Sequence, residues 1–309
     1  MSTSLGAWIQ RHQLAAYFIL AYLITWLGVS PLVAAGLGLI SPSVPDAWHA
    51  IGALGPIVAA FAVTALVSGR RGVGHLLRSM ARWRVGIWWW LAAALSPFAL
   101  FIGSALLLRL FGQPWPDLGL LARTFGDSNW LFGAFFAAIV YGLGEEPGWR
   151  GFALPRLQRR RNALAASAIL TIFWVLWHIP FFAYRYHLGA VDFVFFVLGI
   201  FAGAIWLTCL YNATGGSVLM VILWHIAWNA VNLFAAVVSG PLVAMLTMEV
   251  IVAAVVIVAI WKPATLSPAP KSVVEAPTAT AVAPGSSTSA ASQPIPQTAE
   301  PVSARTRPD

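Results

Sequence analysis

Two adjacent carboxylates and an arginine lie at the end of an apolar stretch of this chain, in the run Gly144-Glu145-Glu146-Pro147-Gly148-Trp149-Arg150. A charged side chain in the hydrocarbon of a membrane costs about 3 kcal/mol, so such residues are rare and commonly functional. Two later apolar stretches each carry a histidine, His178 and His225, and Asn229 follows the second. We therefore interpret the three segments as parts of one buried polar site.

Helical spacing places several of these side chains next to one another. His225 and Asn229 are four residues apart, so on a helix an imidazole and a carboxamide share one face. Trp174 has the same spacing from His178, one turn earlier, and is expected to separate the site from lipid.

The two glutamates are expected to have different roles. Glu146 and Arg150 are four apart with the acid first, which favours an ion pair. Neighbouring side chains on a helix diverge by about 100°, so Glu145 points elsewhere and is assigned as the reacting carboxylate. Pro147 lacks an N–H and predicts a kink or an end of the helix with local unwinding, which is tolerated at membrane depth where backbone lines a cavity.

The chemistry indicated by this set is hydrolysis by an activated water. Glu145, helped by His178, would take a proton from water. His225 and Asn229 would donate hydrogen bonds to the oxygen of a tetrahedral intermediate. Alternatively, Glu145, His178 and His225 would ligate a zinc ion that activates the water, although the chain lacks the H-E-x-x-H motif of many zinc proteases. The residues leave both chemistries open.

Composition indicates which elements must position these side chains. The chain has 309 residues, is 60% hydrophobic and only 9% charged, and has a mean hydropathy of +0.80. A soluble domain would carry roughly a quarter charged residues, and no alternating strand pattern of a membrane barrel is present. We predict an all-α polytopic membrane protein with about eight transmembrane helices around a polar intramembrane cavity, at 14–40, 48–67, 87–111, 129–146, 163–183, 191–211, 217–238 and 241–261.

Arginine distribution predicts the orientation. The loops 68–86 and 147–162 are rich in arginine, whereas loop 112–128 has only Arg123. The positive-inside rule then predicts that both chain termini lie on the cytoplasmic side. The first apolar stretch is longer than the core of a signal peptide and is interpreted as a retained span. We expect a multi-pass protein of the cytoplasmic membrane.

Four regions are expected along the chain. Residues 1–128 would hold the N-terminal spans, 129–238 the catalytic membrane core and 239–262 the last span. The Pro/Ala/Ser/Thr-rich tail 263–309 cannot bury a core and is predicted to be disordered. Glu249, midway in the last span, is a further costly charge for which the sequence names no partner.

Three ordered motifs resemble a known family. Glu145-Glu146-x-x-x-Arg150, an aromatic residue four before His178, and His225-x-x-x-Asn229 resemble the CAAX-protease and bacteriocin-processing family (CPBP, or Abi) of intramembrane endopeptidases, related to the Ras-converting prenyl protease. The resemblance covers about residues 129–238. The catalytic set that the resemblance implies is Glu145, His178, His225 and Asn229. Glu146 and Arg150 are implied to support this set. Trp174 departs from the family's usual phenylalanine, which bears on the shape of the pocket.

The sequence thus predicts an intramembrane endopeptidase of the CAAX-processing type, glutamate-dependent or a metalloprotease, with a cavity open to the cytoplasmic leaflet. Its expected partners are the bilayer and a peptide or C-terminal tail of a membrane-associated or lipidated substrate, and not nucleic acid. Glutamate catalysis would need no cofactor, whereas the alternative would need zinc. The main rival is a non-catalytic immunity or scaffolding protein that uses the same cavity for binding. A proton-linked transporter would show inverted repeats, which we do not find.

Overall fold

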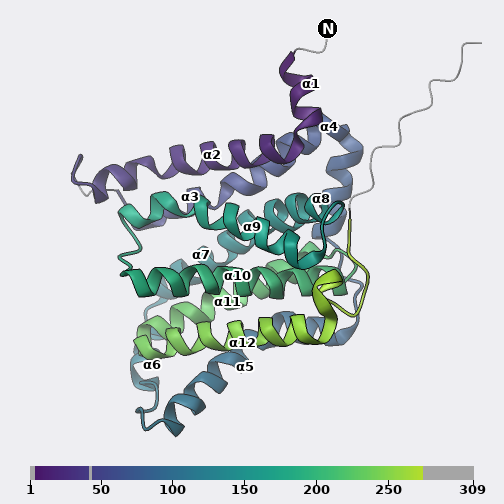
Figure 1. Cartoon of the computed structure of the whole chain (residues 1–309). Helices are drawn as coiled ribbons and strands as arrows, with labels where there is room; N and C mark the ends of the chain where they lie inside the picture. Colours follow the sequence, from purple (N-terminus) through teal and green to yellow (C-terminus); the bar gives the residue numbers. More distant parts are fainter. Residues whose placement is uncertain (1–3, 42–43, 274–309) are drawn as a thin grey trace, which may run out of the picture. The chain divides into compact units, whose positions relative to one another are not determined.

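The computed structural model describes residues 4–41 and 44–273, and within these ranges the chain forms helices and no strands (Figure 1). The first half contains α1 (Ser4–Arg11), α2 (Gln13–Gly36), η1 (Asp46–Trp48), α3 (His49–Gly52), α4 (Leu54–Met80), α5 (Ile87–Leu110), α6 (Leu118–Gly126) and α7 (Ser128–Gly148). The second half contains η2 (Trp149–Ala153), α8 (Leu154–Gln158), α9 (Ala163–Trp177), η3 (Ile179–Ala183), α10 (Ala190–Ala213), α11 (Val218–Val238) and α12 (Gly240–Thr265).

The helices match the predicted spans closely. Within the described residues, 7 helical segments are long and apolar enough to cross a membrane, so the chain is an all-α, multi-pass integral membrane protein. The predicted span 129–146 is helical, as α7, but it is not one of those 7. The count of eight spans and the orientation in the membrane stay predictions.

One predicted loop is largely helical. We expected a loop over 68–86, but α4 continues to Met80 after a break at Gly69, whose φ of 56° and ψ of −155° are open to glycine and strained for other residues. Beyond the break, Leu76 and Ser79 are buried while Arg70, Arg71 and Arg78 are exposed. This segment is amphipathic, which the charge count alone concealed.

The helix distortion expected at Pro147 is present as a wider turn. The α-helical α7 ends at Gly148 and a π-helical segment, η2, follows over Trp149–Ala153 before α8 resumes the α-helix. Proline removes an i→i−4 hydrogen bond, and π-turns of this kind are frequent at functional sites. The result is that Glu145 and Glu146 precede an irregular stretch of backbone that contains Arg150.

Short polar residues fix where the histidine-bearing helices begin. The Asn162 side chain accepts a hydrogen bond from Ala165 N at 2.7 Å and caps α9, and Ser217 accepts one from Met220 N at 3.3 Å and caps α11. The helix α9 ends just before His178, and Pro180 falls in the 3₁₀ turn η3 that follows. His178 therefore lies at a helix end, and His225 lies within a helix.

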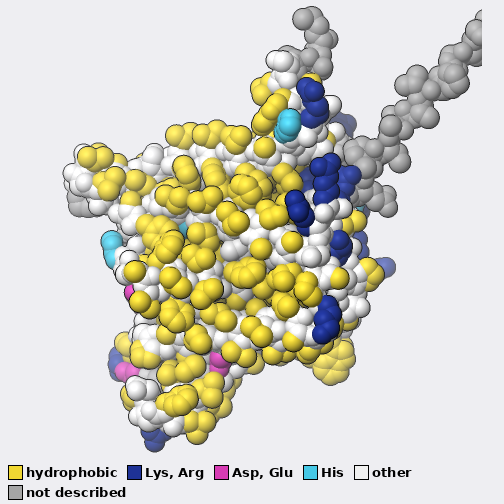
Figure 2. Space-filling model, in the orientation of Figure 1, with side chains coloured by type: hydrophobic (Ala, Val, Ile, Leu, Met, Phe, Trp, Pro, Cys, Tyr) yellow, Lys and Arg dark blue, Asp and Glu magenta, His cyan; other side chains and the backbone are white. Residues whose placement is uncertain are grey.

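The arginine-rich segments lie at the same end of the molecule. Ser217 Oγ, in the α10–α11 turn, donates to Arg82 O at 2.7 Å. Arg156 Nε donates to Gln13 Oε1 at 3.0 Å, and Gln158 Nε2 to Asn212 Oδ1 at 3.0 Å. Figure 2 shows most lysine and arginine side chains along one edge, where α4, α8 and α12 end in Figure 1. We call this the basic end.

The start of the predicted tail packs on the basic end. Asn212 Nδ2 donates to Thr265 O at 2.8 Å, and Ser272 N donates to Asn212 Oδ1 at 3.0 Å. Lys271 Nζ reaches Arg161 O at 2.8 Å. Residues 274–309 lie outside the described residues, so the disordered tail stays a prediction.

Candidate active site

Glu146 is the centre of a fully buried ion cluster. Its carboxylate accepts two hydrogen bonds from Arg150 Nη1, at 2.8 and 3.1 Å, which is the ion pair expected from their spacing. Its Oε1 also lies 2.6 Å from Nδ1 of His225 on α11. The exposed fraction of the Glu146 and Arg150 side chains is 0%. Because a buried carboxylate needs partners, this cluster ties η2 and α11 to the end of α7.

Glu145 has different partners, although it is the next residue. Its Oε2 accepts hydrogen bonds from two indole groups, Trp174 Nε1 at 2.9 Å and Trp149 Nε1 at 3.3 Å. Oε1 has no hydrogen bond to any residue in the described part of the chain. Glu145 is buried, with 6% of its surface exposed, so Oε1 is the oxygen left for a small molecule such as water.

The hydrogen bonds of the two histidines define which ring nitrogen is available. His178 Nδ1 lies 2.7 Å from the carbonyl oxygen of Trp174, so Nδ1 carries the proton and Nε2 has the lone pair. His225 Nδ1 faces the Glu146 carboxylate and donates to it in the same way. Both rings therefore have Nε2 as the nitrogen not engaged by the protein.

A cavity of about 630 Å³ brings His178, His225 and Asn229 together. It lies among α9, α10, α11 and α12, and aromatic side chains form much of its wall: Trp174, Tyr186, Phe195, Phe196, Trp224 and Trp228. Asn229 makes no hydrogen bond with a described residue, so its carboxamide is available to a ligand. Glu145 does not line the cavity itself; it lies behind Trp174, which contacts both the cavity and the Glu145 carboxylate.

The cavity extends away from the basic end. Its lining residues include Leu188, Asp192 near the start of α10 and Gly240 at the start of α12, whereas these helices end at the basic end. The arginine-rich segments contribute no lining residue among those described. The opening to the cytoplasmic leaflet stays a prediction, because it depends on which side of the membrane the basic end faces. The spacing of residues in the sequence indicates how deep each side chain lies along its helix. It does not indicate on which side the packed helices leave a cavity.

The zinc alternative has no assembled ligand set. Among the residues that the structure describes, no group of three or more His, Cys, Asp or Glu is arranged to hold a metal ion. The hydrogen bonds of the protein engage Glu145 Oε2 and the Nδ1 atoms of both histidines, so Glu145 Oε1 and the two Nε2 atoms are the ones that would bind a metal. Because these residues are not assembled as a metal site, we develop the hydrolysis without a metal.

Several residues of the site were missed in the sequence. Trp149 is four residues after Glu145, and Asn232 is seven after His225 on the same helical face, so spacing could have found both. Tyr186, in the connection between η3 and α10, had no such signal. Burial raises the pKa of the Tyr186 phenol above its usual range, so this side chain lines the cavity as a neutral hydroxyl.

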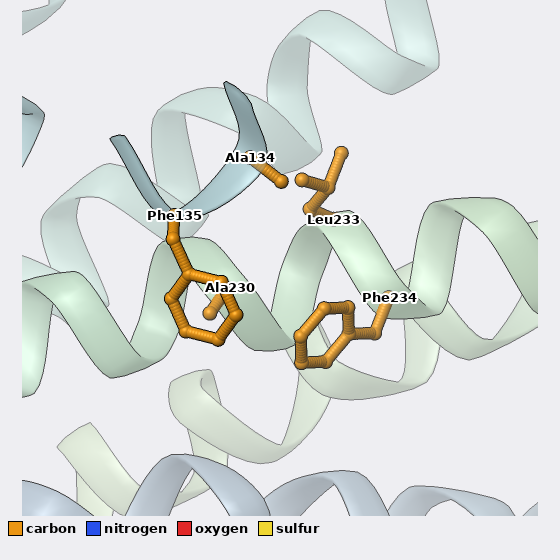
Figure 3. Close-up of a pocket in the computed structure, with 5 residues that line it drawn as sticks. All are labelled: Ala134, Phe135, Ala230, Leu233 and Phe234. Atoms are coloured by element: carbon orange, nitrogen blue, oxygen red, sulfur yellow. The ribbon is translucent and has the colours of Figure 1, made fainter. Parts of the chain in front are cut away.

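A second hollow is lined only by apolar side chains. It lies between α7 and α11, and Figure 3 shows that its labelled side chains carry only carbon, namely those of Ala134, Phe135, Ala230, Leu233 and Phe234. It shares no lining residue with the cavity that His225 and Asn229 line. This hollow therefore adds no group to the polar site.

Comparison with known proteins agrees with the motifs. The sequence model described as type II CAAX prenyl endopeptidase Rce1-like matches residues 127–231. The predicted resemblance is confirmed. CAAX prenyl protease 2 of Methanococcus maripaludis is 31% identical over 101 residues, which cover 30% of this chain and 37% of that relative. The match thus spans little more than a third of the relative's length.

Proposed function

We propose that this chain is an intramembrane endopeptidase of the CAAX-processing type. The observation that carries the proposal is that the adjacent glutamates have different partners. Glu146 binds Arg150 and His225, while one oxygen of Glu145 has no hydrogen-bond partner in the described part of the chain. The match to the Rce1-like family over residues 127–231 supports the same conclusion. A protein that only binds a ligand has no need of both a carboxylate base and donors for an oxyanion.

Hydrolysis begins with a water next to Oε1 of Glu145. The carboxylate takes one proton from this water, with His178 Nε2 as the neighbouring acceptor, and the hydroxyl adds to the carbonyl carbon of the scissile peptide bond. When the C–N bond breaks, the proton held by Glu145 passes to the leaving amine. Glu145 thus ends the cycle as a carboxylate.

The tetrahedral intermediate carries a negative oxygen that needs donors. Asn229 offers its side-chain N–H groups, which make no hydrogen bond with the described protein. Glu146 orients the His225 ring through Nδ1 and complements the positive charge of an imidazolium, whose Nε2–H then donates to the same oxygen. Since His225 and Asn229 are neighbours on one face of α11, both reach a single oxyanion.

The cavity indicates the class of substrate. Its aromatic wall fits an apolar chain, and three of its polar side chains lie along α11, namely His225, Asn229 and Asn232. We propose that the substrate is a peptide or C-terminal tail of a membrane-associated or lipidated protein. The named relative is a CAAX prenyl protease, which makes prenylated peptides the first probes to use.

The test is cleavage of a lipidated peptide library by purified protein, with and without a chelator. Glu145→Gln is expected to abolish cleavage, because the amide cannot accept the proton, and to leave the unfolding temperature unchanged. Glu249→Gln is the matched control, since it removes another intramembrane carboxyl outside the cavity, and is expected to keep activity. Cleavage is expected to survive chelation.

Full cleavage by the Glu145→Gln variant would overturn the assignment of this base. Loss of cleavage on chelation, with about one zinc bound per chain, would favour the zinc alternative. Binding of the peptides without cleavage under any condition would favour the non-catalytic immunity or scaffolding function.

A further inference from the structure

Two tryptophans donate hydrogen bonds to one oxygen of Glu145. Trp149 lies on η2, one turn after Glu145, and Trp174 comes from α9. Their indole Nε1 atoms lie 3.3 and 2.9 Å from the same Oε2 atom. Because both donors converge on Oε2, rotation of the carboxylate is restrained and Oε1 remains the free oxygen. The two donors come from different elements, η2 and α9, so they hold the Glu145 carboxylate from two directions.

Each indole is itself held in place. Trp149 has an exposed fraction of 0% and packs edge-on against Tyr17, with ring centroids 5.8 Å apart, and edge-on against Trp177 at 6.0 Å. Trp174 has the Arg150 guanidinium over its ring at 4.3 Å from the centroid. A side chain packed in this way has lost its rotational freedom before the substrate binds, which is the requirement for a positioning group.

Other buried indoles show what an ordinary tryptophan does here. Trp177 Nε1 donates to Thr25 Oγ1 at 2.8 Å, and Trp224 Nε1 donates to Ser96 Oγ at 3.0 Å. Buried indoles generally find one acceptor, and a nearby hydroxyl is sufficient. Trp149 and Trp174 differ because both converge on one ionisable oxygen of the proposed base.

We propose that Trp149 and Trp174 are positioning residues for Glu145, which hold Oε2 so that Oε1 faces the attacking water. This rests on the proposed function, in which Glu145 is the base. Misplacement of a reacting group by about 1 Å can cost a factor of about 100 in rate.

The test removes the indole N–H groups, in one variant with little change in the shape of the side chain. Trp149 is exchanged for β-(3-benzothienyl)alanine, in which sulfur takes the place of the indole N–H, and the conventional variants Trp149→Phe and Trp174→Phe are made beside it. We expect kcat for peptide cleavage to fall about 10- to 100-fold. KM is expected to stay unchanged for the Trp149 variants, because Trp149 does not line the cavity, and to change for Trp174→Phe, because Trp174 does.

Trp90→Phe is the matched control, since it removes an indole hydrogen bond that goes to Trp83 O, at 3.2 Å, and not to Glu145. Its kcat is expected to stay within a factor of two or so of the parent chain. An unchanged kcat in the benzothienylalanine protein, or an equal loss in Trp90→Phe, would overturn the positioning role. These results are distinguishable from failure of the proposed function, which full activity of Glu145→Gln would signal.

Discussion

At the scale of single residues, two adjacent glutamates differ because their neighbours differ. Glu146 is neutralised by Arg150 and oriented toward His225, whereas Glu145 is bound by neutral indole donors. The two carboxylates diverge around the helix, as neighbours do, so each faces a separate set of partners. One carboxylate is compensated by two cationic partners, and the other is the base of the proposed reaction.

Replacement of Arg150 by alanine should destabilise the protein. The change leaves Glu146 buried with His225 as its remaining ion partner and removes the contact over the Trp174 ring. Breaking a buried ion pair costs about 3–5 kcal/mol, so we expect a marked fall in the unfolding temperature and yield in detergent. Arg160→Ala, at an exposed position, is the control. Normal yield and unfolding temperature of the Arg150→Ala protein would contradict this importance of the pair.

At the scale of elements, α2 supports the site although it lies outside the matched residues 127–231. Tyr22 on α2 donates to Phe173 O at 2.6 Å, and Trp26 Nε1 donates to Trp177 O at 3.2 Å. Thr25 Oγ1 accepts from Trp177 Nε1 and donates to Gly52 O at 2.7 Å. The helix α2 therefore holds the end of α9 that leads into His178, and we expect the N-terminal part of the chain to be needed for the stability of the candidate site.

Thr25→Val tests this support. Valine has the same shape but leaves the Trp177 N–H without its acceptor and the Gly52 carbonyl without its donor, in a fully buried position. An unsatisfied buried polar group costs about 1–3 kcal/mol, which should appear as a lower unfolding temperature. Ser30→Ala on the same helix, where the hydroxyl is exposed, should have little effect. Equal stability of both variants would argue against the role of α2.

The packing of α10 leaves the room for a ligand. Gly203 lines the cavity, and a Cβ atom placed there would meet nothing within 4 Å. Gly203→Leu should therefore fold normally but fill part of the cavity. We expect KM to rise more than tenfold for peptides with a long apolar chain, since each buried methylene group contributes about 0.8 kcal/mol, and much less for short ones. Gly133→Leu, which also adds a side chain into open space but lies outside the cavity, is the control. An equal change of KM for long and short substrates would contradict the role of Gly203 in leaving room for a long apolar chain.

At the scale of the whole molecule, charge and cavity lie at opposite ends. The arginine-rich segments gather at the basic end (Figure 2). The cavity extends toward Asp192 and Gly240. If the basic end is cytoplasmic, as the positive-inside rule predicts, the far end of the cavity faces the other side of the membrane. Substrate access thus depends on the orientation of the chain.

Cysteine labelling determines that orientation. Cys209 is the single cysteine and is buried, so Cys209→Ala gives a background for one introduced thiol. In intact cells, Arg160→Cys should be protected from a membrane-impermeant maleimide and Gln113→Cys should react, because the predicted orientation places position 160 inside. The opposite pattern would reverse the orientation and would place the far end of the cavity on the cytoplasmic side.

The sequence by itself determined the helices and the local pairs. Apolar runs are long enough to fix the spans, and Asn162 and Ser217 mark the starts of α9 and α11 because capping is a local interaction. The Glu146–Arg150 pair follows from a spacing of four residues. The amphipathic continuation of α4 was missed, because a count of arginines does not reveal which residues between them are buried.

Only the tertiary structure decided which distant residues meet. His225 reaches Glu146 across 79 positions and Trp174 reaches Glu145 across 29, and no periodicity within one helix specifies the rotation of another helix against it. The direction of the cavity likewise depends on where glycines such as Gly203 leave space between packed helices. Local spacing named the residues of the site, and packing between helices assigned their partners.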